Sequence, residues 1–517
     1  MTQTPPPPQA SGGSPVDDRD PLGIADHAPL LRAWLDAEDA VRTGTLTPFT
    51  IPGHKQRTDL LGRLTQGDLP LYGGLAPIKA ADELLARAEQ LAAEHFGADW
   101  CRFSVGGSTH GNQALALGVG RPGRPVVVAR TLHRSGLSAL ILAGLNPVWV
   151  HPRLHEQTHL PLGVDPGAVR AALAEHPDAC AVLLTDPSYV GTCGDLPALA
   201  DVAHAAGVPL ILDAAWGAHF GAHPALPPHP LAAGADALVT SAHKTLPALN
   251  QATYVLARTT RTGGLLDADR LTRAFETGHT TSPSGAILAS LDAARAVLAL
   301  HGQALAEELL RLVTLARRRL AAVPGLRVLD PGTGVAGAAG RAGTVRLDPA
   351  KLVLQLAGTG AHGHAVEADL VAAGLPVELA DRDTLIPMIT LADDEDGVDR
   401  LLSTLEASIA RHGGPARSPG RNPAWAIAAG SITQQALSPR EAFFADHERV
   451  PWAQAAGRVC AEIVAPYPPG VPVLAPGELV TPEALAAVAA ARADGSRIAY
   501  AADPTLSTLE VVRVRQS

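Results

Sequence analysis

An aspartate and a lysine stand at the ends of two apolar runs that predict neighbouring buried strands. Asp213 ends the run 208–213 (Val-Pro-Leu-Ile-Leu-Asp), and Lys244 follows the run 237–241 by three residues. Runs that are apolar throughout are typical of parallel strands, which are buried on both faces. The C-terminal ends of parallel strands meet at one edge of a sheet, where ligands collect. A lysine amine can form a Schiff base and an aspartate can keep a pyridinium nitrogen protonated, so the pair indicates pyridoxal 5'-phosphate (PLP) chemistry.

Small and hydroxyl-bearing residues fill the segment 103–112 (Phe-Ser-Val-Gly-Gly-Ser-Thr-His-Gly-Asn). Ser108 and Thr109 offer hydroxyl groups where a helix is expected to begin, and the glycines let the backbone approach an anion. The segment predicts a phosphate seat, although such residues at a helix start also cap their own backbone. His133 directly follows the expected strand 126–130. Its imidazole could stack on a flat ring, and a surface or structural histidine is the alternative.

A zinc-protease pattern, His-Glu-x-x-His, occurs at 155–159. The pattern binds zinc only when both histidines lie on one face of a helix. Pro152 and Pro161 bracket it closely, and so short a segment between prolines cannot form a stable helix. We therefore predict no zinc site here and no metal site elsewhere.

A second motif is typical of dinucleotide binding. The apolar run 351–356 is followed by Gly-x-Gly-x-x-Gly at 358–363, and Glu378 and Asp381 follow at about the spacing of a ribose-binding acid. Only about 50 residues remain before a Gly/Pro-rich segment, too few for a doubly wound dinucleotide domain. We therefore predict a tight strand-to-helix turn, and an NAD-dependent oxidoreductase is the distant alternative.

The order of the expected elements indicates an α/β fold. Between about 75 and 260, helical patterns alternate with apolar runs, as in a parallel or mostly parallel sheet with helices on both faces. One or two long helices are expected at 284–323. The expected strands are 126–130, 148–150, 181–185, 210–213 and 237–241, and the first two helices are 80–96 and one that begins near 111.

The sequence predicts five segments. These are a disordered proline-rich tail at 1–24, an N-terminal segment with the cofactor-binding large domain at 25–324, a small α+β domain at 325–412, a linker at 413–423 and a C-terminal domain at 424–517. In the small α+β domain we expect strands 326–329, 343–347, 352–356 and 377–379 and helices 363–373 and 396–411.

Composition excludes several classes of protein. The net charge is −10 and the basic residues are scattered, which argues against a nucleic-acid partner. The four cysteines are far apart in sequence, as expected in a reducing compartment. No apolar run approaches the roughly 18 residues that span a bilayer, and the polar N-terminus does not resemble a secretory signal. We therefore expect a cytoplasmic protein that makes no membrane contact.

Together the motifs resemble the PLP-dependent Orn/Lys/Arg decarboxylases, which have the aspartate-aminotransferase fold (PLP fold type I). The resemblance begins near residue 48, and its most specific parts are 241–244 (Ser-Ala-His-Lys) and 467–472 (Tyr-Pro-Pro-Gly-Val-Pro). Because the family-like region begins early, we expect the short form without an N-terminal wing domain. The other matching segments are 51–55, 106–109, 133–135, 186–189, 213–216, 281–283, 289–295, 438–444 and 476–478.

This resemblance implies a role for each candidate residue. Lys244 resembles the Schiff-base lysine, Asp213 the partner of the pyridine nitrogen and His133 the histidine that stacks on the ring. Lys244 or His243 is the candidate acid that returns a proton to Cα. The resemblance also implies cofactor contacts from Ser108, Thr109, His133, Asp213, Ala215, Ser241, His243 and Lys244.

The implied reaction is α-decarboxylation of a basic amino acid, giving agmatine or a diamine. Arginine is favoured over lysine and ornithine because the shorter members of the resembled family often serve polyamine synthesis through agmatine. A guanidinium also suits bidentate pairing with a carboxylate. Glu378 and Glu478 are the candidate acids for the substrate's cation, and a structural or solvated carboxylate is the alternative for each. The resemblance implies a homodimer with shared active sites. An aminotransferase, an aldolase-type enzyme or a non-catalytic PLP carrier of the same fold stays open.

Overall fold

The computed structural model describes residues 19–156, 160–329, 346–420, 425–426, 428, 434–467 and 470–513. Most of the predicted tail 1–24 therefore lies outside the described residues. The carboxylate of Asp20 accepts hydrogen bonds from the backbone N–H groups of Ile24 and Ala25, each at 2.9 Å. Ile24 is buried. The folded part of the chain thus begins by Asp20, earlier than the predicted boundary.

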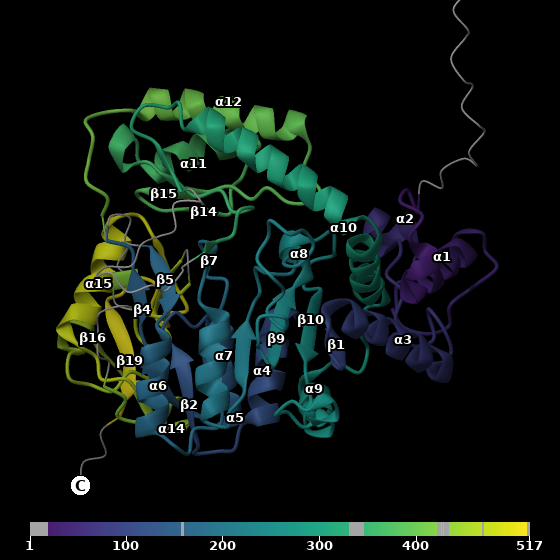
Figure 1. Ribbon diagram of the computed structural model, residues 1–517, viewed down its shortest axis with the longest axis horizontal. Coiled ribbons are helices and arrows are strands. Elements are labelled where there is room, and N and C mark those ends of the chain that lie inside the picture. Colours follow the sequence, from purple (N-terminus) through teal and green to yellow (C-terminus); the bar gives the residue numbers. More distant parts are fainter. Residues whose placement is uncertain are drawn as a thin grey trace, which may run out of the picture.

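A seven-stranded sheet forms the centre of the molecule, in the order β1-β10-β9-β8-β6-β2-β3 (Figure 1). Neighbours from β3 to β9 are parallel, whereas β10 is antiparallel to both β9 and β1. Two reversals make β1 run in the same direction as β9, so both end at the same edge. The strands are β1 (Trp100–Ser104), β2 (Pro125–Ala129), β3 (Asn146–Val150), β6 (Val182–Thr185), β8 (Leu210–Asp213), β9 (Ala237–Ser241) and β10 (Thr253–Ala257).

The prediction of a mostly parallel sheet is confirmed. All five predicted strands form, and β8 and β9 have the predicted bounds. Sequence analysis did not predict β1 and β10. The second predicted helix begins at Gly107, four residues before the expected start.

Side chains of this sheet alternate between two apolar cores. Leu210 and Leu212 of β8 pack on one face, whereas Ile211 between them packs on the other. Burial on both faces explains why the strands are apolar throughout. The first core includes residues of α3 (Ile78–Phe96), α6 (Pro166–Glu175), α7 (Leu196–Ala205) and α10 (Gly285–Leu320), and the second includes residues of α4 (Gly107–Val119), α5 (Arg134–Ala143) and α9 (Ala268–Gly278).

The region predicted to hold one or two long helices is one helix, α10, of 36 residues. Among the described helices it is the one long and apolar enough to cross a membrane, and 61% of its apolar stretch is buried inside the protein. Leu288 and Leu291 are fully buried in the core of the large domain. Helix α1 (Pro29–Arg42) packs on α10, and Leu30 N–H donates to Asp292 Oδ2 at 2.8 Å. The apolar face of α10 therefore packs as a core helix does.

A small α+β unit (residues 327–412) lies beyond the C-terminal ends of the parallel strands (Figure 1). Its sheet has the order β11-β13-β15-β14, with every pair antiparallel. Helix α11 packs on β14 and β15, and α12 packs on α11. The elements are β11 (Arg327–Val328), β13 (Leu354–Gln355), α11 (Gly363–Ala372), β14 (Leu379–Ala380), β15 (Thr384–Ile386) and α12 (Glu395–His412).

Both predicted helices of this unit form within one residue of their expected bounds. Strand β15 was not predicted. Of the predicted strand 343–347, residues 343–345 lie outside the described residues. The rest, β12 (Arg346–Leu347), pairs with β7 (Thr192–Cys193) of the large domain and not with the small sheet. The segment after β12 is thereby held close to the large domain.

The C-terminal part of the chain has its own apolar core and lies at the left of the view in Figure 1. Strand β16 pairs with β19 and β17 pairs with β18, while α14 packs on α5. The elements are α14 (Pro439–Phe444), β16 (His447–Pro451), β17 (Ala465–Tyr467), α15 (Pro482–Ala493), β18 (Arg497–Ala499) and β19 (Thr508–Val512).

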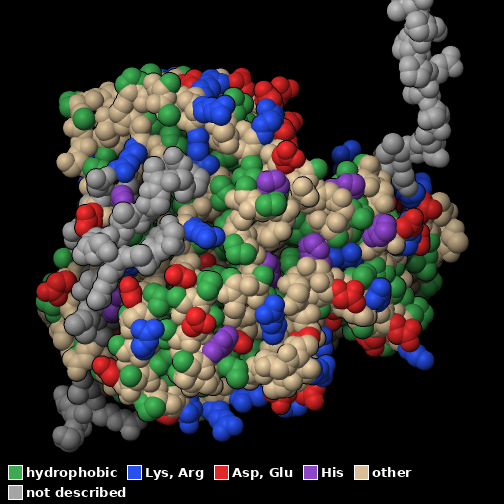
Figure 2. Space-filling view, viewed as in Figure 1, with side chains coloured by type: hydrophobic (Ala, Val, Ile, Leu, Met, Phe, Trp, Pro, Cys, Tyr) green, Lys and Arg blue, Asp and Glu red, His purple; other side chains and the backbone are tan. Residues whose placement is uncertain are grey.

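The His-Glu-x-x-His pattern begins directly after β4 (Pro152–Leu154), which pairs antiparallel with β5 (Pro161–Val164). His155 N–H donates to Leu160 O at 2.9 Å, and residues 157–159 lie outside the described residues. Within the described parts of the chain, no group of three His, Cys, Asp or Glu residues is placed to hold a metal. On the face shown in Figure 2, acidic side chains separate the basic ones into several groups.

Candidate active site

A cavity of about 470 Å³ opens where the parallel strands end. This volume falls within the roughly 300–1,000 Å³ of small-molecule sites. The cavity collects segments that are far apart in sequence, because the loops after β1, β2, β6, β8 and β9 all reach the same edge. All the sequence-predicted site residues except one line it: Ser108, Thr109, His133, Asp213, Ala215, Ser241, His243, Lys244 and Glu378.

Asp213 is held in place by a polar chain that reaches His133. Asn112 Nδ2 donates to Asp213 Oδ2 at 2.8 Å and to Ser135 Oγ at 2.9 Å. Ser135 Oγ lies 2.9 Å from His133 Nδ1, which also accepts from the Ser135 backbone N–H at the start of α5. Asp213 Oδ1 accepts from Ala215 N–H at 3.2 Å, and the residue is 4% exposed. These contacts fix the orientation of both the carboxylate and the imidazole.

Lys244 lies in the short helix α8 (Ala242–Thr245), directly after β9. Burial lowers the pKa of its amine, and the carboxylates of Asp213 and Glu378 oppose this shift. Its Nζ lies 4.1 Å from the centre of the Trp216 ring. His243 Nδ1 lies 3.0 Å from the carbonyl oxygen of Ala252, and burial lowers the pKa of this imidazole. Both side chains therefore favour their neutral forms more than they would in water.

The predicted phosphate seat lies at the start of α4. Ser108 Oγ is 2.6 Å from Ser241 Oγ, so the two hydroxyl groups meet at one point of the cavity wall. Among the described residues, no side chain caps this helix start. The first N–H groups of a helix lack partners inside the helix and attract anions. A phosphate group would therefore find backbone donors and hydroxyl groups at one place.

The far wall of the cavity carries aromatic rings and one carboxylate. Tyr189, in the loop after β6, donates its hydroxyl hydrogen to Glu378 Oε1 at 2.8 Å. Glu378 belongs to the small α+β unit, just before β14. The ring of Tyr189 meets the Trp216 ring edge-on, with 5.2 Å between their centres. Trp425 and Tyr467 complete the wall. Burial and Glu378 both raise the pKa of Tyr189, which keeps its hydroxyl protonated.

Glu478, the other candidate acid for the substrate, does not line the cavity. Its side chain is fully buried and forms an ion pair of 3.1 Å with Arg130, which is 1% exposed. Arg130 also donates to the backbone oxygens of Pro472 and Val473. A carboxylate held in this way is not free to meet a substrate. This placement favours a structural role for Glu478 over a role in binding the substrate.

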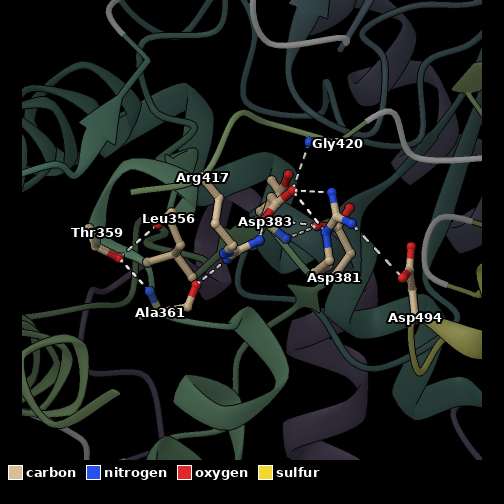
Figure 3. A network of polar contacts seen from close by, with 10 residues as sticks. Leu356, Thr359, Ala361, Asp381, Asp383, Arg417, Gly420 and Asp494 are labelled. Atoms are coloured by element: carbon tan, nitrogen blue, oxygen red, sulfur yellow. Dashed lines mark hydrogen bonds and ion pairs between the residues drawn. The ribbon is translucent and has the colours of Figure 1, made fainter. Parts of the chain in front are cut away.

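The Gly-x-Gly-x-x-Gly turn at 358–363 is covered by the chain's own linker (Figure 3). Arg417 N–H donates to Ala357 O at 2.8 Å, and its Nη2 donates to Ala361 O at 2.6 Å. The same guanidinium binds Asp383 Oδ1 at 2.6 Å. The turn also joins an antiparallel sheet, not the parallel βαβ unit that dinucleotide binding requires. These features disfavour the oxidoreductase alternative.

The cavity residues fit pyridoxal phosphate. A buried carboxylate, a buried amine, an imidazole and a phosphate seat line one space of suitable size. Thr185 Oγ1 is buried beside the cavity and has no hydrogen-bond partner among the described residues. Such an orphaned group is expected where a ligand supplies the missing contact. Asp213 would hold the ring nitrogen, His133 would cover the ring, and Ser108, Thr109 and Ser241 would hold the phosphate.

A mostly parallel seven-stranded sheet with Asp213 and Lys244 at adjoining strand ends defines a PLP enzyme of fold type I. Residues 74–396 match the family Orn/Lys/Arg decarboxylase, major domain, and residues 427–491 match its C-terminal domain. The chain therefore belongs to the Orn/Lys/Arg decarboxylase family. As in that family, it is a PLP-dependent decarboxylase of a basic amino acid.

Relatives and solved structures agree with this assignment. The chain is 33% identical to the arginine decarboxylase of Bacillus subtilis (strain 168), over 91% of this chain and 95% of that protein. It is 34% identical to the arginine decarboxylase of Halalkalibacterium halodurans, with the same coverage of each chain. The Francisella novicida lysine decarboxylase LdcF aligns with a TM-score of 0.79 at 18% identity, over 94% of this chain and 81% of that one, which shows a shared fold.

Several residues of the cavity had no predicted role. Asn112 lies one helical turn after Ser108 and could have been inferred to share its helix face. Ser135 and Tyr189 stand in segments of the family resemblance, which offered a signal. Trp425 carries no local motif, and only the packing of distant segments brings it to the cavity. Lys351 also carries no local motif, and it lies beside Trp216 outside this cavity.

Proposed function

We propose that this chain converts arginine to agmatine and CO₂, with Lys244, Asp213, His133 and His243 as its catalytic residues. The observation that carries the arginine assignment is the carboxylate of Glu378, held by Tyr189 on an aromatic cavity wall. A planar guanidinium can pair with a carboxylate through two hydrogen bonds and stack on aromatic rings, which a compact ammonium does less well. Four relatives that are 32–34% identical over 83–91% of this chain bear the name arginine decarboxylase.

Bound PLP supplies an electron sink for the pair of electrons left when CO₂ departs. Asp213 keeps a proton on the ring nitrogen, because a buried carboxylate beside that atom favours its charged form. His133, oriented by Ser135, covers the ring and excludes water from it. The Lys244 amine, whose pKa burial lowers, is available to accept and return a proton at Cα, and His243 is the other candidate. Glu378 binds the cation at the far end of the substrate.

Release of CO₂ from arginine, lysine and ornithine, measured in parallel with product identification, tests the proposal. We expect kcat/KM to be highest for arginine. Glu378→Gln should raise KM for arginine about 10- to 100-fold with a smaller change in kcat, because a hydrogen bond to a charged group contributes roughly 1.5–3 kcal/mol. Tyr189→Phe, which keeps the carboxylate but removes its hydrogen-bond donor, should raise KM less. A higher kcat/KM for lysine or ornithine would refute the arginine assignment.

A homodimer with shared active sites is part of this proposal. Large apolar side chains gather in the segment 49–64 and are widely exposed: Phe49 (93%), Ile51 (57%), Leu60 (60%), Leu61 (58%) and Leu64 (84%). Exposed apolar residues in such number are typical of a surface that another chain covers. The segment includes α2 (Thr58–Leu61). Sedimentation should give the mass of a dimer, and Phe49→Glu with Leu64→Glu should shift it toward the monomer and lower activity.

We further propose the domain division 25–324, 325–412 and 424–517, with a linker at 413–423. The two family matches, 74–396 and 427–491, support the boundary at the linker. We propose a cytoplasmic location, which the four unpaired cysteines support. Limited proteolysis within 413–423 followed by mass analysis tests the first proposal, and cell fractionation tests the second.

A further inference from the structure

The amines of two lysines, Lys244 and Lys351, contact the indole of Trp216. Lys351 lies in the small α+β unit between β12 and β13, and its Nζ is 3.8 Å from the centre of the Trp216 ring. The corresponding distance for Lys244 is 4.1 Å. Trp216 lines the main cavity, whereas Lys351 borders a smaller cavity of about 20 Å³ beside Trp216. The indole therefore contacts both an amine of the small α+β unit and the reacting lysine.

Lys351 is buried without a direct ion pair among the described residues. It is 5% exposed, and among the described residues no carboxylate lies within ion-pair distance of its Nζ. Asp348 is close by, but its Oδ2 pairs with His219 at 3.1 Å and its Oδ1 accepts from Ala350 N–H at 2.9 Å. The single hydrogen-bond partner of Lys351 Nζ in the described chain is Met388 Sδ, at 3.4 Å. The Trp216 ring face contacts the amine directly, while the carboxylates of Asp348 and Glu378 favour its charged form from a greater distance.

Such an arrangement costs stability. Removing an ammonium from water is unfavourable, and a cation–π contact offsets only part of that cost. Consistent with this, burial lowers the pKa of Lys351 to about 8. An apolar side chain of the same length would fill the space more favourably. The amine is therefore not explained by stability alone.

Lysine is rare in this chain. Of its 41 basic residues only four are lysines, namely Lys55, Lys79, Lys244 and Lys351. Two of the four pack on Trp216. A guanidinium is larger than an ammonium, and a space of about 20 Å³ leaves little room for it. The site accepts a compact cation at this position.

We propose that Lys351 is a positioning residue for decarboxylation: its ammonium group holds the Trp216 indole in place and so fixes the cavity wall beside Lys244. The inference rests on the proposed role of Lys244. The wall matters because the bond that breaks must keep one orientation relative to the cofactor ring. A shift of about 1 Å in a reacting group can lower a rate by roughly 100-fold.

The test compares Lys351→Met, Lys351→Gln and the matched control Lys79→Met, which replaces an exposed lysine of α3. We expect Lys351→Met to lower kcat about 10- to 100-fold, to change KM by less than threefold and to leave Tm unchanged or raised. Lys351→Gln should lower kcat similarly and serves if the methionine variant does not fold. Lys79→Met should match the wild type. The visible absorbance of the bound cofactor should persist in all of them.

Trp216→Phe, alone and combined with each Lys351 variant, tests whether Lys351 acts through the indole. Residues that act as a unit give non-additive effects, so the double variant should be no slower than the slower single variant. Multiplicative effects would overturn the proposal, as would a Lys351 variant with kcat within twofold of the wild type. A loss of activity explained entirely by a lower Tm would overturn it as well. Wild-type CO₂ release tests the proposed function separately, so its failure is distinguishable from a failure here.

Discussion

Replacing Glu478 with glutamine should destabilise the enzyme without altering its affinity for substrate. Glu478 is fully buried and pairs with Arg130 at 3.1 Å, and its Oε2 also accepts from Ala475 N–H at 2.9 Å. The glutamine would leave the guanidinium of Arg130 buried without a counter-ion. Breaking a buried pair in this way costs roughly 3–5 kcal/mol. Because Arg130 directly follows the large-domain strand β2 and Glu478 belongs to the C-terminal part, the loss should weaken the contact between these two parts of the chain.

Urea denaturation followed by circular dichroism measures this loss. Glu483→Gln, which changes an exposed acid of α15, is the control and should lower stability by less than about 1 kcal/mol. Arg130→Met combined with Glu478→Leu should recover most of the loss, because an apolar pair replaces two buried charges. KM for arginine should stay within threefold of the wild type in the folded Glu478→Gln enzyme. A tenfold higher KM with unchanged denaturation would refute the structural role and restore Glu478 as a substrate-binding acid.

Four further changes have defined outcomes. Lys244→Ala should abolish CO₂ release and the visible absorbance of the bound cofactor, and a band that persists after dialysis would contradict the role of Lys244. Asp213→Asn should retain PLP but lower kcat by about two to three powers of ten, since loss of a buried charge partner costs roughly 3–5 kcal/mol; near wild-type rates would contradict this. Gly360→Ala should lower the unfolding midpoint, because φ at this residue is +75° and a Cβ would lie 2.4 Å from the Gly414 carbonyl. If the wild type bound NAD saturably and this variant did not, the oxidoreductase alternative would be revived. Lys351 has a pKa of about 8 in the folded protein and 10.5 in the unfolded reference, so the unfolded chain binds more protons between these pH values. The free energy of unfolding should therefore rise with pH by up to about 3 kcal/mol. Urea titrations at pH 7–11 should show this rise for the wild type and not for Lys351→Met.

The parts of the site that follow strands could be predicted from the sequence. Asp213 and Lys244 were inferred to share an edge because βαβ connections align strand ends, and β8 and β9 are adjacent parallel strands. The phosphate seat at Ser108 followed from small residues before a helix, and the helix start lies at Gly107. These predictions rest on local pattern together with one geometric rule of parallel sheets. The rule applies even when the order of the strands in the sheet is not known.

Contacts between segments far apart in sequence could not be predicted in this way. β1 and β10 were missed, although their order decides where the α4 helix start lies relative to Lys244. Glu378 and Glu478 have similar sequence surroundings, an acid beside apolar residues, and only packing puts one in the cavity and the other against Arg130. A hydrophobic pattern indicates that a segment has a buried face, but it does not indicate which other segment packs against that face.

Lys351 shows most clearly why contacts between distant segments cannot be predicted from local sequence. Its neighbours in sequence, Pro349-Ala350 and Leu352-Val353, indicate only a loop that leads into an apolar strand. The pairing of β12 with β7 brings this loop to the large domain, where the amine meets an indole that also contacts Lys244. Burial of a cation that has no direct ion pair is unfavourable, and neither local propensity nor packing explains it. The proposed role in holding Trp216 while the reaction proceeds accounts for its presence, so the kinetic effect of removing it should exceed the effect on stability.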